Sequence, residues 1–402
     1  MKHKYIALFA ALALFCGCES DDSDFDDIIA ALQEEQGDSV MSIAFDYSVL
    51  YEEEAAYADD DNDYVENSTF SNVIYVVYSG NTATLSGDVD AVSATVSGAH
   101  VVVEPYDKNI EYVLSGQSDD GSFKTYGENK FKITLDGLDL TNPTGAVINN
   151  QCKKTAYIVL ADGSDNSLAD GSAYDLPDEE DMKGALFSEG QLAFSGSGTL
   201  TVTASYKNAI VSDDYIVFRA GNVINATSTA GNAIKANDGI YIRGGVLNIA
   251  VSADGAKGLN CEAETVISGG RTTIITSGGT HVEGVDTTGC GGLKSDLQLS
   301  VTAGTLLIKS TGEGAKGINC NADIAITGGT VCCVTLGEKG NTSPKCIKAD
   351  GTIAISDAHV YSYSAYSDPI DAALGLTIAD GYSLLTDDAH LFEVSYDAAT
   401  DD

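Results

Sequence analysis

Short runs of alternating apolar and polar residues fill the chain after residue 70, in units of about 24 residues. Alternation with a period of two is typical of β-strands, in which every second side chain points inward. A small side chain follows each opening aliphatic residue by two positions, and a small pair such as Gly269-Gly270 comes about eleven positions after it. The opening aliphatic residues, separated by 24, 24, 25, 34, 25, 29 and 23 positions, are Leu186, Ile210, Ile234, Leu259, Leu293, Ile318, Ile347 and Ile370.

This repeat predicts an all-β fold, a parallel β-helix with coils of about 24 residues, because no single unit can bury its apolar face alone. Helical solenoids need longer apolar stretches at 3.6-residue spacing, and the sequence after residue 70 has none. The 42 glycines, five prolines and absent tryptophan suit short strands joined by tight turns. The spacings of 34 and 29 predict loops that bulge from single coils.

The texture of the sequence divides the chain into four parts. Residues 1–17 are predicted to be a signal peptide, and residues 18–70 an acidic, largely flexible tether. Residues 71–130 are rich in strand-like runs but lack the 24-residue spacing, so we expect a β-rich cap that covers the first coil. The parallel β-helix itself is expected over residues 131–395.

The N-terminus indicates export and lipidation. A charged start is followed by an apolar run, Tyr5 to Phe15, that is too short to span a bilayer. Gly17-Cys18 resembles the end of a bacterial lipobox, so Cys18 is the predicted lipidation site, and the acidic run after it resembles the export tag of surface lipoproteins. We therefore predict an outer membrane lipoprotein exposed at the cell surface. The alternative is a plain tether that faces the periplasm.

The formal net charge of −39 and the pI of about 4.1 make nucleic acid and anionic lipid poor partners. No other run in the sequence is apolar enough to cross a membrane, so the lipid is the expected anchor. An acidic surface suits a protein that holds divalent cations, although solubility alone also accounts for much of this charge.

Seven cysteines remain after the signal region, without a CxxC pair. The odd number and the spacing argue against a zinc site or a complete disulfide framework. Cys261 and Cys320 occupy the small inward position of their coils, so we expect them to be buried packing residues. Cys332 and Cys333 are neighbours in a strand and are expected to point to opposite faces.

Several segments together resemble a bacterial family of β-helical carbohydrate-binding proteins over roughly residues 100–380. They are Phe131 to Leu140, Tyr157 to Leu168, Ala185 to Leu192 and Gly196 to Val202, with the Gly-Gly-centred coils that follow. The resemblance implies a fold like that of calcium-dependent pectate lyases, bound calcium, and binding of acidic plant polysaccharide or cellulose without cleavage. Coils of that family often begin Asp-Gly-Ile, whereas this chain has residues such as Asn232, Lys257 and Lys316 at the first position.

A row of carboxylates one residue past the small inward position forms the predicted calcium site. Stacked coils are about 4.8 Å apart, so these side chains and their neighbours are expected to line one edge as a ladder of the oxygen ligands that calcium prefers. The predicted ligands are Asp213, Asp214, Asp238, Asp254, Glu262 and Asp296. The alternative is a solvated row of turns with asparagines that hydrogen-bond between coils.

Lysines recur near the same turn in a chain with only 21 basic residues. Lysines on one face suit the carboxylates of an acidic sugar, and exposed tyrosines suit stacking on sugar rings. The predicted carbohydrate-binding residues are Lys235, Lys257, Lys316, Tyr206 and Tyr241. Compensation of the acidic row by lysine is the alternative interpretation.

These observations predict a cell-surface lipoprotein that binds polysaccharide, in particular an acidic, pectin-like glycan, together with calcium. No catalytic residue is assigned. Two alternatives stay open, a calcium-dependent polysaccharide lyase with Lys257 or Lys316 as the base beside Glu262, and a structural adhesin. A second acidic cluster, with His281, Glu283 and Asp286, lies in the insertion of residues 280–292.

Overall fold

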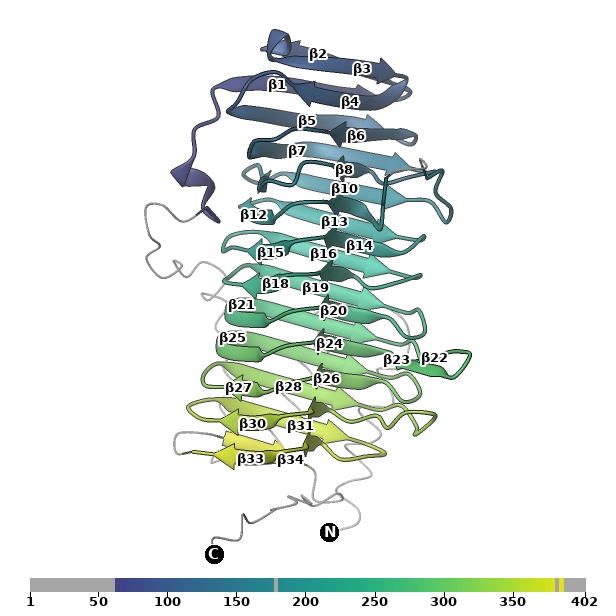
Figure 1. Cartoon of the computed structure of the whole chain (residues 1–402), viewed down its shortest axis with the longest axis vertical. Helices are drawn as coiled ribbons and strands as arrows, with labels where there is room; N and C mark the ends of the chain where they lie inside the picture. Colours follow the sequence, from purple (N-terminus) through teal and green to yellow (C-terminus); the bar gives the residue numbers. More distant parts are fainter. Residues whose placement is uncertain (1–61, 177–179, 380–382, 387–402) are drawn as a thin grey trace, which may run out of the picture. The chain divides into compact units, whose positions relative to one another are not determined.

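The computed structural model describes residues 62–176, 180–379 and 383–386, all within one compact unit, Ser48–Asp402. These residues form an all-β solenoid of about 11 turns with about 25 residues per turn, which confirms the predicted parallel β-helix (Figure 1). The predicted signal peptide, Cys18, the tether up to residue 61 and residues 387–395 lie outside the described residues. Within the described ranges, no helix is long and apolar enough to cross a membrane.

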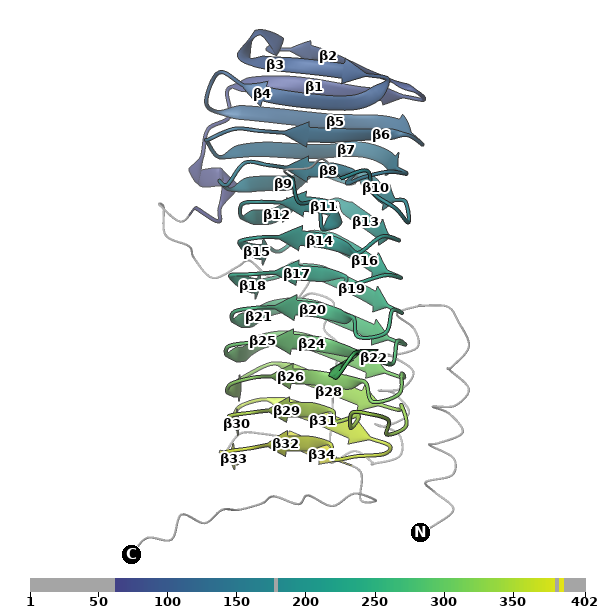
Figure 2. The same ribbon diagram turned by 45° about the vertical axis from the view of Figure 1, so that its right-hand side comes forward.

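The coils have three faces, and Figure 2 shows the strands of the first face stacked one above another. The first face is a 12-stranded sheet of β3 (Val92–Ser97), β4 (Ala99–Pro105), β6 (Gly121–Thr125), β8 (Ile148–Asn150), β11 (Gly184–Ser188), β14 (Asn208–Ser212), β17 (Ile234–Ala236), β20 (Lys257–Cys261), β24 (Gly291–Ser295), β26 (Lys316–Cys320), β29 (Ile347–Ala349) and β32 (Ile370–Ala372).

The second and third faces join into a 20-stranded sheet. The second face holds β9 (Ala156–Leu160), β12 (Leu192–Gly196), β15 (Tyr215–Phe218), β18 (Gly239–Ile242), β27 (Ile324–Ile326), β30 (Thr352–Ile355) and β33 (Gly375–Ile378). The third face holds β10 (Asp165–Asp170), β13 (Thr199–Ala204), β16 (Val223–Ser228), β19 (Val246–Val251), β28 (Thr330–Thr335), β31 (His359–Ser364) and β34 (Ser383–Thr386). Long strands cross from one face to the other, namely β5 (Ile110–Ser118), β7 (Phe131–Asn142), β21 (Thr265–Thr276) and β25 (Leu299–Ser310).

The opening aliphatic residues stack in register through the core of the first face. Ile210 pairs with Ile234, Ile234 with Leu259, and the ladder continues through Leu293 to Ile318 and beyond. All five side chains are at most 1% exposed. Burying each one contributes about 1.5–3 kcal/mol relative to leaving it in water. The repeat seen in the sequence is therefore the core of the molecule.

The small pairs form the corner between the second and third faces. Gly270 has a φ of +68°, a left-handed conformation that glycine adopts without steric cost. A Cβ on Gly269 would lie 2.3 Å from the carbonyl oxygen of Arg243 in the preceding coil. Glycine is needed at both positions, because the chain must turn sharply while it packs against the coil before it.

The region expected as a cap contributes both antiparallel and parallel strands. Antiparallel pairing joins β1 (Asn72–Ser79) to β2 (Thr82–Gly87) and β3 to β4, with the short 3-10 helix η3 (Val89–Ala91) between them. Strands β5 and β6 already pair in parallel with β7 and β8. The parallel stack therefore begins before residue 131, and only its end has cap-like pairing.

The described start of the chain lies against the second face. It includes the 3-10 helix η2 (Val65–Asn67). The Tyr215 hydroxyl donates to the carboxylate of Asp63 at 2.6 Å, and the Arg219 guanidinium donates to Glu66 at 2.7 Å. Residues 62–66 of the predicted tether are thus held on the β-helix.

The cysteines expected to be packing residues are buried. Cys261 and Cys320 are 0% exposed, and their thiols donate to backbone carbonyls of Glu264 and Leu297. This confirms the packing role. All seven cysteines among the described residues are free thiols.

Candidate functional site

The outward side chains of the first face form a polar row across neighbouring coils. The residue between the inward aliphatic and the inward small residue points outward, because side chains alternate along a strand. Strand register places Lys235 beside Asn260, Asn260 beside Lys294, Lys294 beside Asn319, and Asn319 beside Lys348. Lysine and an amide therefore alternate along this face.

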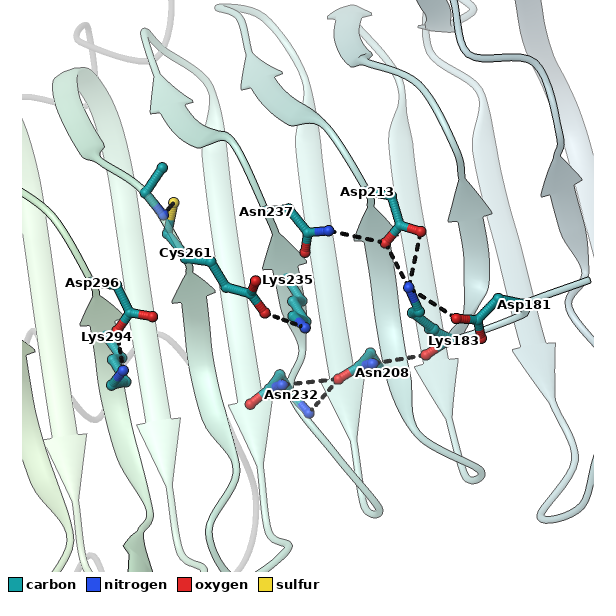
Figure 3. A network of polar contacts seen from close by, with 12 residues as sticks. Asp181, Lys183, Asn208, Asp213, Asn232, Lys235, Asn237, Cys261, Lys294 and Asp296 are labelled. Atoms are coloured by element: carbon teal, nitrogen blue, oxygen red, sulfur yellow. Dashed lines mark hydrogen bonds and ion pairs between the residues drawn. The ribbon is translucent and has the colours of Figure 1, made fainter.

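The carboxylates predicted to bind calcium contact lysines of the same face. Lys183 lies 2.9 Å from Asp213, and Lys235 lies 2.7 Å from Glu262. Lys294 makes an ion pair with Asp296. Figure 3 shows this network. The row is thus compensated by ammonium groups at these three carboxylates.

Amides connect the carboxylate row between coils. Asn237 Nδ2 donates to Asp213 at 3.3 Å, and Asn321 Nδ2 donates to Asp296 at 2.8 Å. At the coil start, Asn232 Nδ2 donates to Asn208 Oδ1 at 3.0 Å (Figure 3). The inter-coil asparagine contacts that the sequence left as an alternative are present in both rows.

The other predicted calcium ligands lie apart from one another. Asp214 accepts hydrogen bonds from the Gln191 side chain and the Tyr215 backbone, and Asp254 accepts one from the Gly279 amide at 2.7 Å. Asp238 is exposed. Among the described residues, no three His, Cys, Asp or Glu side chains come together as a metal site. The contacts of this row fit ammonium partners better than a calcium ion.

A cavity of about 510 Å³ opens on the first face around β20, β24 and β26. Three lysines line it, Lys257, Lys294 and Lys316, and we refer to it as the lysine pocket. Glu262 and Asp296 also line it, so the structure brings together four of the predicted site residues, Lys257, Lys316, Glu262 and Asp296. Register explains the meeting, because Lys257 and Lys316 both pair with Gly291 of the coil between them.

Lys257 is the most buried of the three lysines, with 6% of its surface exposed. Its Nζ donates to the carbonyl oxygen of Gly255 at 2.6 Å and to that of Gly289. Burial, together with the charges of Lys294 and Lys316, lowers the pKa of Lys257 to about 8, although the Cys290 thiol acts in the opposite direction. The Lys257 ammonium group therefore loses its proton at a lower pH than an ordinary lysine does, around pH 8.

Lys316 lies half-buried at the other side of Gly291. Burial is the main cause that lowers the pKa of Lys316, and the positive charges of Lys348 and Lys345 lower it further. Within the described residues, neither Lys316 nor Lys257 has a carboxylate at ion-pair distance. Lys183, Lys235, Lys294, Lys345 and Lys348 on the same face each have one.

An insertion closes one side of the lysine pocket. The insertion folds into a hairpin of β22 (Thr280–Glu283) and β23 (Asp286–Gly289), which projects from the stack (Figure 1). Thr287, Thr288 and Thr342 contribute to the pocket wall. The sequence predicted only the acidic residues of this insertion as a candidate site. Thr287 and Thr288 lie at no position of the repeat, so no pattern in the sequence indicated them.

The acidic residues of the insertion lie on the exposed surface of the hairpin. Glu283 faces Asp286 across the turn, and His281 faces Thr288. The side chains of His281, Glu283 and Asp286 are all exposed. None of these three residues lines the pocket.

The predicted tyrosines lie away from the lysine pocket. Tyr241 belongs to β18 on the second face, where its hydroxyl donates to Glu264 at 2.8 Å and its ring packs edge-on against Tyr215. Tyr206 stacks on Tyr174 with ring centroids 4.1 Å apart. Tyr241 lies apart from Lys257 because the chain turns a corner between β17 and β18. Tyr206 lies between β13 and β14, two coils before the coil of Lys257.

A model of the family described as "Carbohydrate-binding domain-containing protein" matches residues 97–388. The match covers nearly the whole described β-helix, including the lysine pocket and its hairpin.

Two relatives add to this match. A carbohydrate-binding domain-containing protein of Acetivibrio thermocellus is 33% identical over 99 residues, which are 24% of this chain and 35% of that protein. The chain thus aligns with about a third of the relative's length. A solved structure of a polysaccharide lyase-like protein from C. thermocellum, as a gadolinium derivative, is 21% identical, with a TM-score of 0.40, and the match covers 77% of this chain and 98% of that one.

Proposed function

The chain belongs to the family of carbohydrate-binding domain-containing proteins, and from this membership we propose that it binds an acidic polysaccharide at the lysine pocket. The proposed ligand is a chain of uronate sugars, whose carboxylates pair with ammonium groups. The pocket volume of about 510 Å³ lies within the roughly 300–1,000 Å³ of small-molecule sites. A short segment of the glycan would enter it while the rest follows the first face.

One observation carries this proposal, the two lysines of the pocket, Lys257 and Lys316, that have no carboxylate at ion-pair distance among the described residues. Burying an ammonium group without a counter-charge is costly, and the lowered pKa values of Lys257 and Lys316 express that cost. A uronate carboxylate between them would supply the missing charge. The neighbouring lysines have such a partner from the protein itself, so the pocket differs from the rest of the face in this respect.

Titration calorimetry with oligogalacturonate and with a neutral cello-oligosaccharide of equal length tests the proposal. We expect the uronate to bind more tightly. Replacing Lys257 and Lys316 with Gln should reduce uronate affinity at least about tenfold, since charged hydrogen bonds contribute about 1.5–3 kcal/mol each. Binding of the neutral glucan should change little.

Lys153→Gln combined with Lys154→Gln is the matched control. It removes the same two charges from two exposed lysines, of which Lys153 lies 3.9 Å from Glu189, far along the stack from the pocket. Equal losses of affinity in this control and in the variant of Lys257 and Lys316 would show that only bulk charge matters, and would reject the lysine pocket. A folded wild type that binds neither glycan would reject polysaccharide binding by this face.

Calcium stays a prediction of the family resemblance. A cation on the predicted row would have to displace Lys183, Lys235 or Lys294 from the carboxylates they now contact. The test is thermal melting with calcium and with a chelator, for the wild type and for Asp213→Asn combined with Asp238→Asn. A calcium-dependent rise that shrinks in the variant would assign the ion to this row, because a ligand that binds only the folded state stabilises it. An unchanged rise would assign it elsewhere.

A polysaccharide lyase is the second candidate, and the state of Lys257 favours it. A neutral Lys257 amine can donate both N–H groups to the Gly255 and Gly289 carbonyls, which leaves its lone pair to accept a proton. It would take the C5 proton of a uronate while a C4–C5 double bond forms and the C4–O bond breaks, and the departing glycosidic oxygen would take a proton from water. Lys316 would lie beside the carboxylate. New ultraviolet absorbance from unsaturated product, lost in Lys257→Gln, would establish this activity.

We also propose a location for this binding activity, the outer surface of the cell. The lipobox-like Gly17-Cys18 and the acidic run after it support the proposal. A lipid at Cys18 would attach the β-helix to the outer membrane, where it would meet polysaccharide outside the cell.

A further inference from the structure

Two buried cysteines lie in contact near the C-terminal end of the stack. Cys333 belongs to β28 on the third face, and Cys346 immediately precedes β29 on the first face. Their sulfur atoms are 2.8 Å apart, and both residues are 0% exposed. We propose that Cys333 and Cys346 form a disulfide in the exported protein. This inference is independent of the proposed polysaccharide site.

The geometry leaves little movement for the bond to form. An S–S bond is about 2.05 Å long, so the two sulfur atoms would need to approach by only about 0.8 Å. The other contacts of the two thiols are with backbone carbonyls, from Cys333 Sγ to the Cys346 oxygen at 3.3 Å and from Cys346 Sγ to the Tyr363 oxygen at 3.2 Å. A disulfide would remove both S–H donors and would shift the two sulfur atoms only slightly.

The repeat shows that both positions differ from those in the preceding coils. The residue before the opening aliphatic is Gly258, Gly292 and Gly317 in three successive coils, and Cys346 in the next. A Cβ on Gly258 or Gly292 would lie within 2.4 Å of an isoleucine methyl group of the third face, from Ile274 or Ile308.

In the next coils, both the glycine and the isoleucine of this contact are replaced by other residues. Strand register places Cys333 beside Ile308, and Ser362 beside Cys333. A Cβ on Gly317 would lie 2.0 Å from the Cys333 sulfur. In this coil Cys346 thus replaces the glycine of earlier coils. Cys333 replaces the isoleucine, and Ser362 follows it at the same position in the next coil.

The remaining buried cysteines lack this arrangement. Cys261 and Cys320 have thiols that donate to carbonyl oxygens, and neither contacts a second sulfur atom. Cys332 adjoins Cys333 in the same strand, but only Cys333 belongs to the apolar core shared with Cys346. The proposal therefore selects one pair among the seven cysteines that the structure describes.

The chemistry is oxidation by thiol–disulfide exchange. The two thiols lose two protons and two electrons, and a disulfide of a small molecule or of an oxidoreductase accepts them and becomes two thiols. Burial raises the pKa of the Cys333 thiol, which suppresses the reactive thiolate in the folded chain. We therefore place bond formation during folding, before the last coils cover the pair.

The bond would fix both ends of the loop between β28 and β29. This loop contains Thr342, whose hydroxyl donates to the Gly314 carbonyl at 2.7 Å and which lines the lysine pocket. A disulfide reduces the number of conformations that the unfolded loop can adopt, so it should stabilise these last coils.

Peptide mapping of the full-length protein tests the pair directly. The protein is refolded in a glutathione redox buffer, then denatured and alkylated without reductant, and its peptides are analysed by mass spectrometry. We expect peptides joined through Cys333 and Cys346, two hydrogen atoms lighter than their reduced sum, with Cys152, Cys261, Cys290, Cys320 and Cys332 alkylated. Complete alkylation of Cys333 and Cys346 would overturn the proposal.

Thermal melting with and without dithiothreitol gives the second readout. The reductant should lower the melting temperature of the wild type and of the control Cys320→Ser by several degrees, and should leave Cys346→Gly unchanged. Glycine is chosen because the preceding coils have it at this position. Should Cys346→Gly fail to fold, Cys333→Ser serves in its place. A reductant shift in Cys346→Gly or Cys333→Ser that equals the shift of the wild type would also reject the disulfide.

Discussion

At the residue scale, the lysine pocket differs from its surroundings through the pairing of its charges. Along the described first face, lysines such as Lys235, Lys294 and Lys348 have a carboxylate within ion-pair distance, and these partly exposed pairs contribute little stability, typically about 0–1 kcal/mol each. Lys257 and Lys316 lack such a partner among the described residues, and burial acts on both. Lys257 and Lys316 therefore contribute no ion pair to stability, which makes them the best candidates for binding a ligand.

The pH dependence of binding follows from these two lysines. The pKa of Lys257 is about 8 in the folded protein, against 10.5 for the unperturbed side chain. Uronate binding needs the charged form, so affinity should fall as the pH rises through about 8, well before an ordinary lysine titrates. Calorimetry with oligogalacturonate between about pH 7 and pH 9.5 measures this.

Arginine variants provide the control for that titration. Arginine stays charged over the whole range, so Lys257→Arg with Lys316→Arg should flatten the pH dependence. Burial raises the pKa of the neighbouring Cys290 thiol above its ordinary value, which delays the formation of a negative charge beside Lys257. A wild-type affinity that stays constant up to pH 9.5 would contradict this role.

The contribution of Lys257 to the free energy of unfolding also depends on pH, in a direction of its own. The Lys257 amine binds a proton more weakly in the folded chain than in the unfolded chain. Between about pH 8 and pH 10.5 the unfolded state therefore holds more protons, and the contribution of this group to folding free energy improves as the pH rises. Binding and stability should thus respond to pH in opposite directions.

At the element scale, the fold could be predicted because its signals are local and repeated. The aliphatic ladder and the small pairs recur at about 24 residues, and the two longer spacings mark loops, so register follows from the sequence alone. The pocket could not be predicted in the same way, because one wall comes from the β22–β23 hairpin and one residue from the loop at Thr342. These insertions have no repeat position that fixes where they fold.

The aliphatic ladder predicts a large loss of stability on truncation. Leu293 is 1% exposed and packs between Leu259 and Ile318. Leu293→Ala should cost about 2–5 kcal/mol of unfolding free energy, from lost burial and the cavity left behind. Leu297→Ala is the control, because this leucine is 56% exposed and its loss should stay within about 0.5 kcal/mol. Urea denaturation compares them, and similar costs would argue against the ladder as the core.

The glycine corner makes a second prediction with an internal control. Gly270 and Gly137 have nearly the same φ, +68° and +71°. A Cβ on Gly270 would meet backbone atoms at 2.5 Å, whereas a Cβ on Gly137 meets nothing within 4 Å. Both Ala variants carry a strain of about 1–3 kcal/mol, but Gly270→Ala must also move the neighbouring coil. Denaturation should show a clearly larger loss for Gly270→Ala, and equal losses would leave strain alone as the cause.

At the scale of the whole molecule, stacking of coils turns a sequence repeat into a surface. Each coil from β17 to β29 contributes one lysine or amide to the first face and one carboxylate or amide to its edge, so these coils form parallel polar rows. The sequence predicted these rows but grouped Tyr241 with them. The corner after Ala236 sends Tyr241 to the second face, and a linear spacing does not reveal which side chains lie beyond a turn.

The last prediction concerns where this surface is displayed. If Cys18 carries a lipid, Cys18→Ala should release the protein from membranes into the soluble fraction, since covalent lipid is the proposed anchor. Deleting residues 20–27 while keeping Cys18 should leave the protein in the membrane fraction but protect it from protease added to intact cells. Fractionation and protease shaving, followed by immunoblotting, separate the two effects. A deletion variant that stays accessible to protease would show that the acidic run is only a tether, and a Cys18→Ala variant that stays in membranes would contradict lipid anchoring. The lysine pocket should bind oligogalacturonate equally in the released protein, because the folded β-helix and not the anchor supplies its groups.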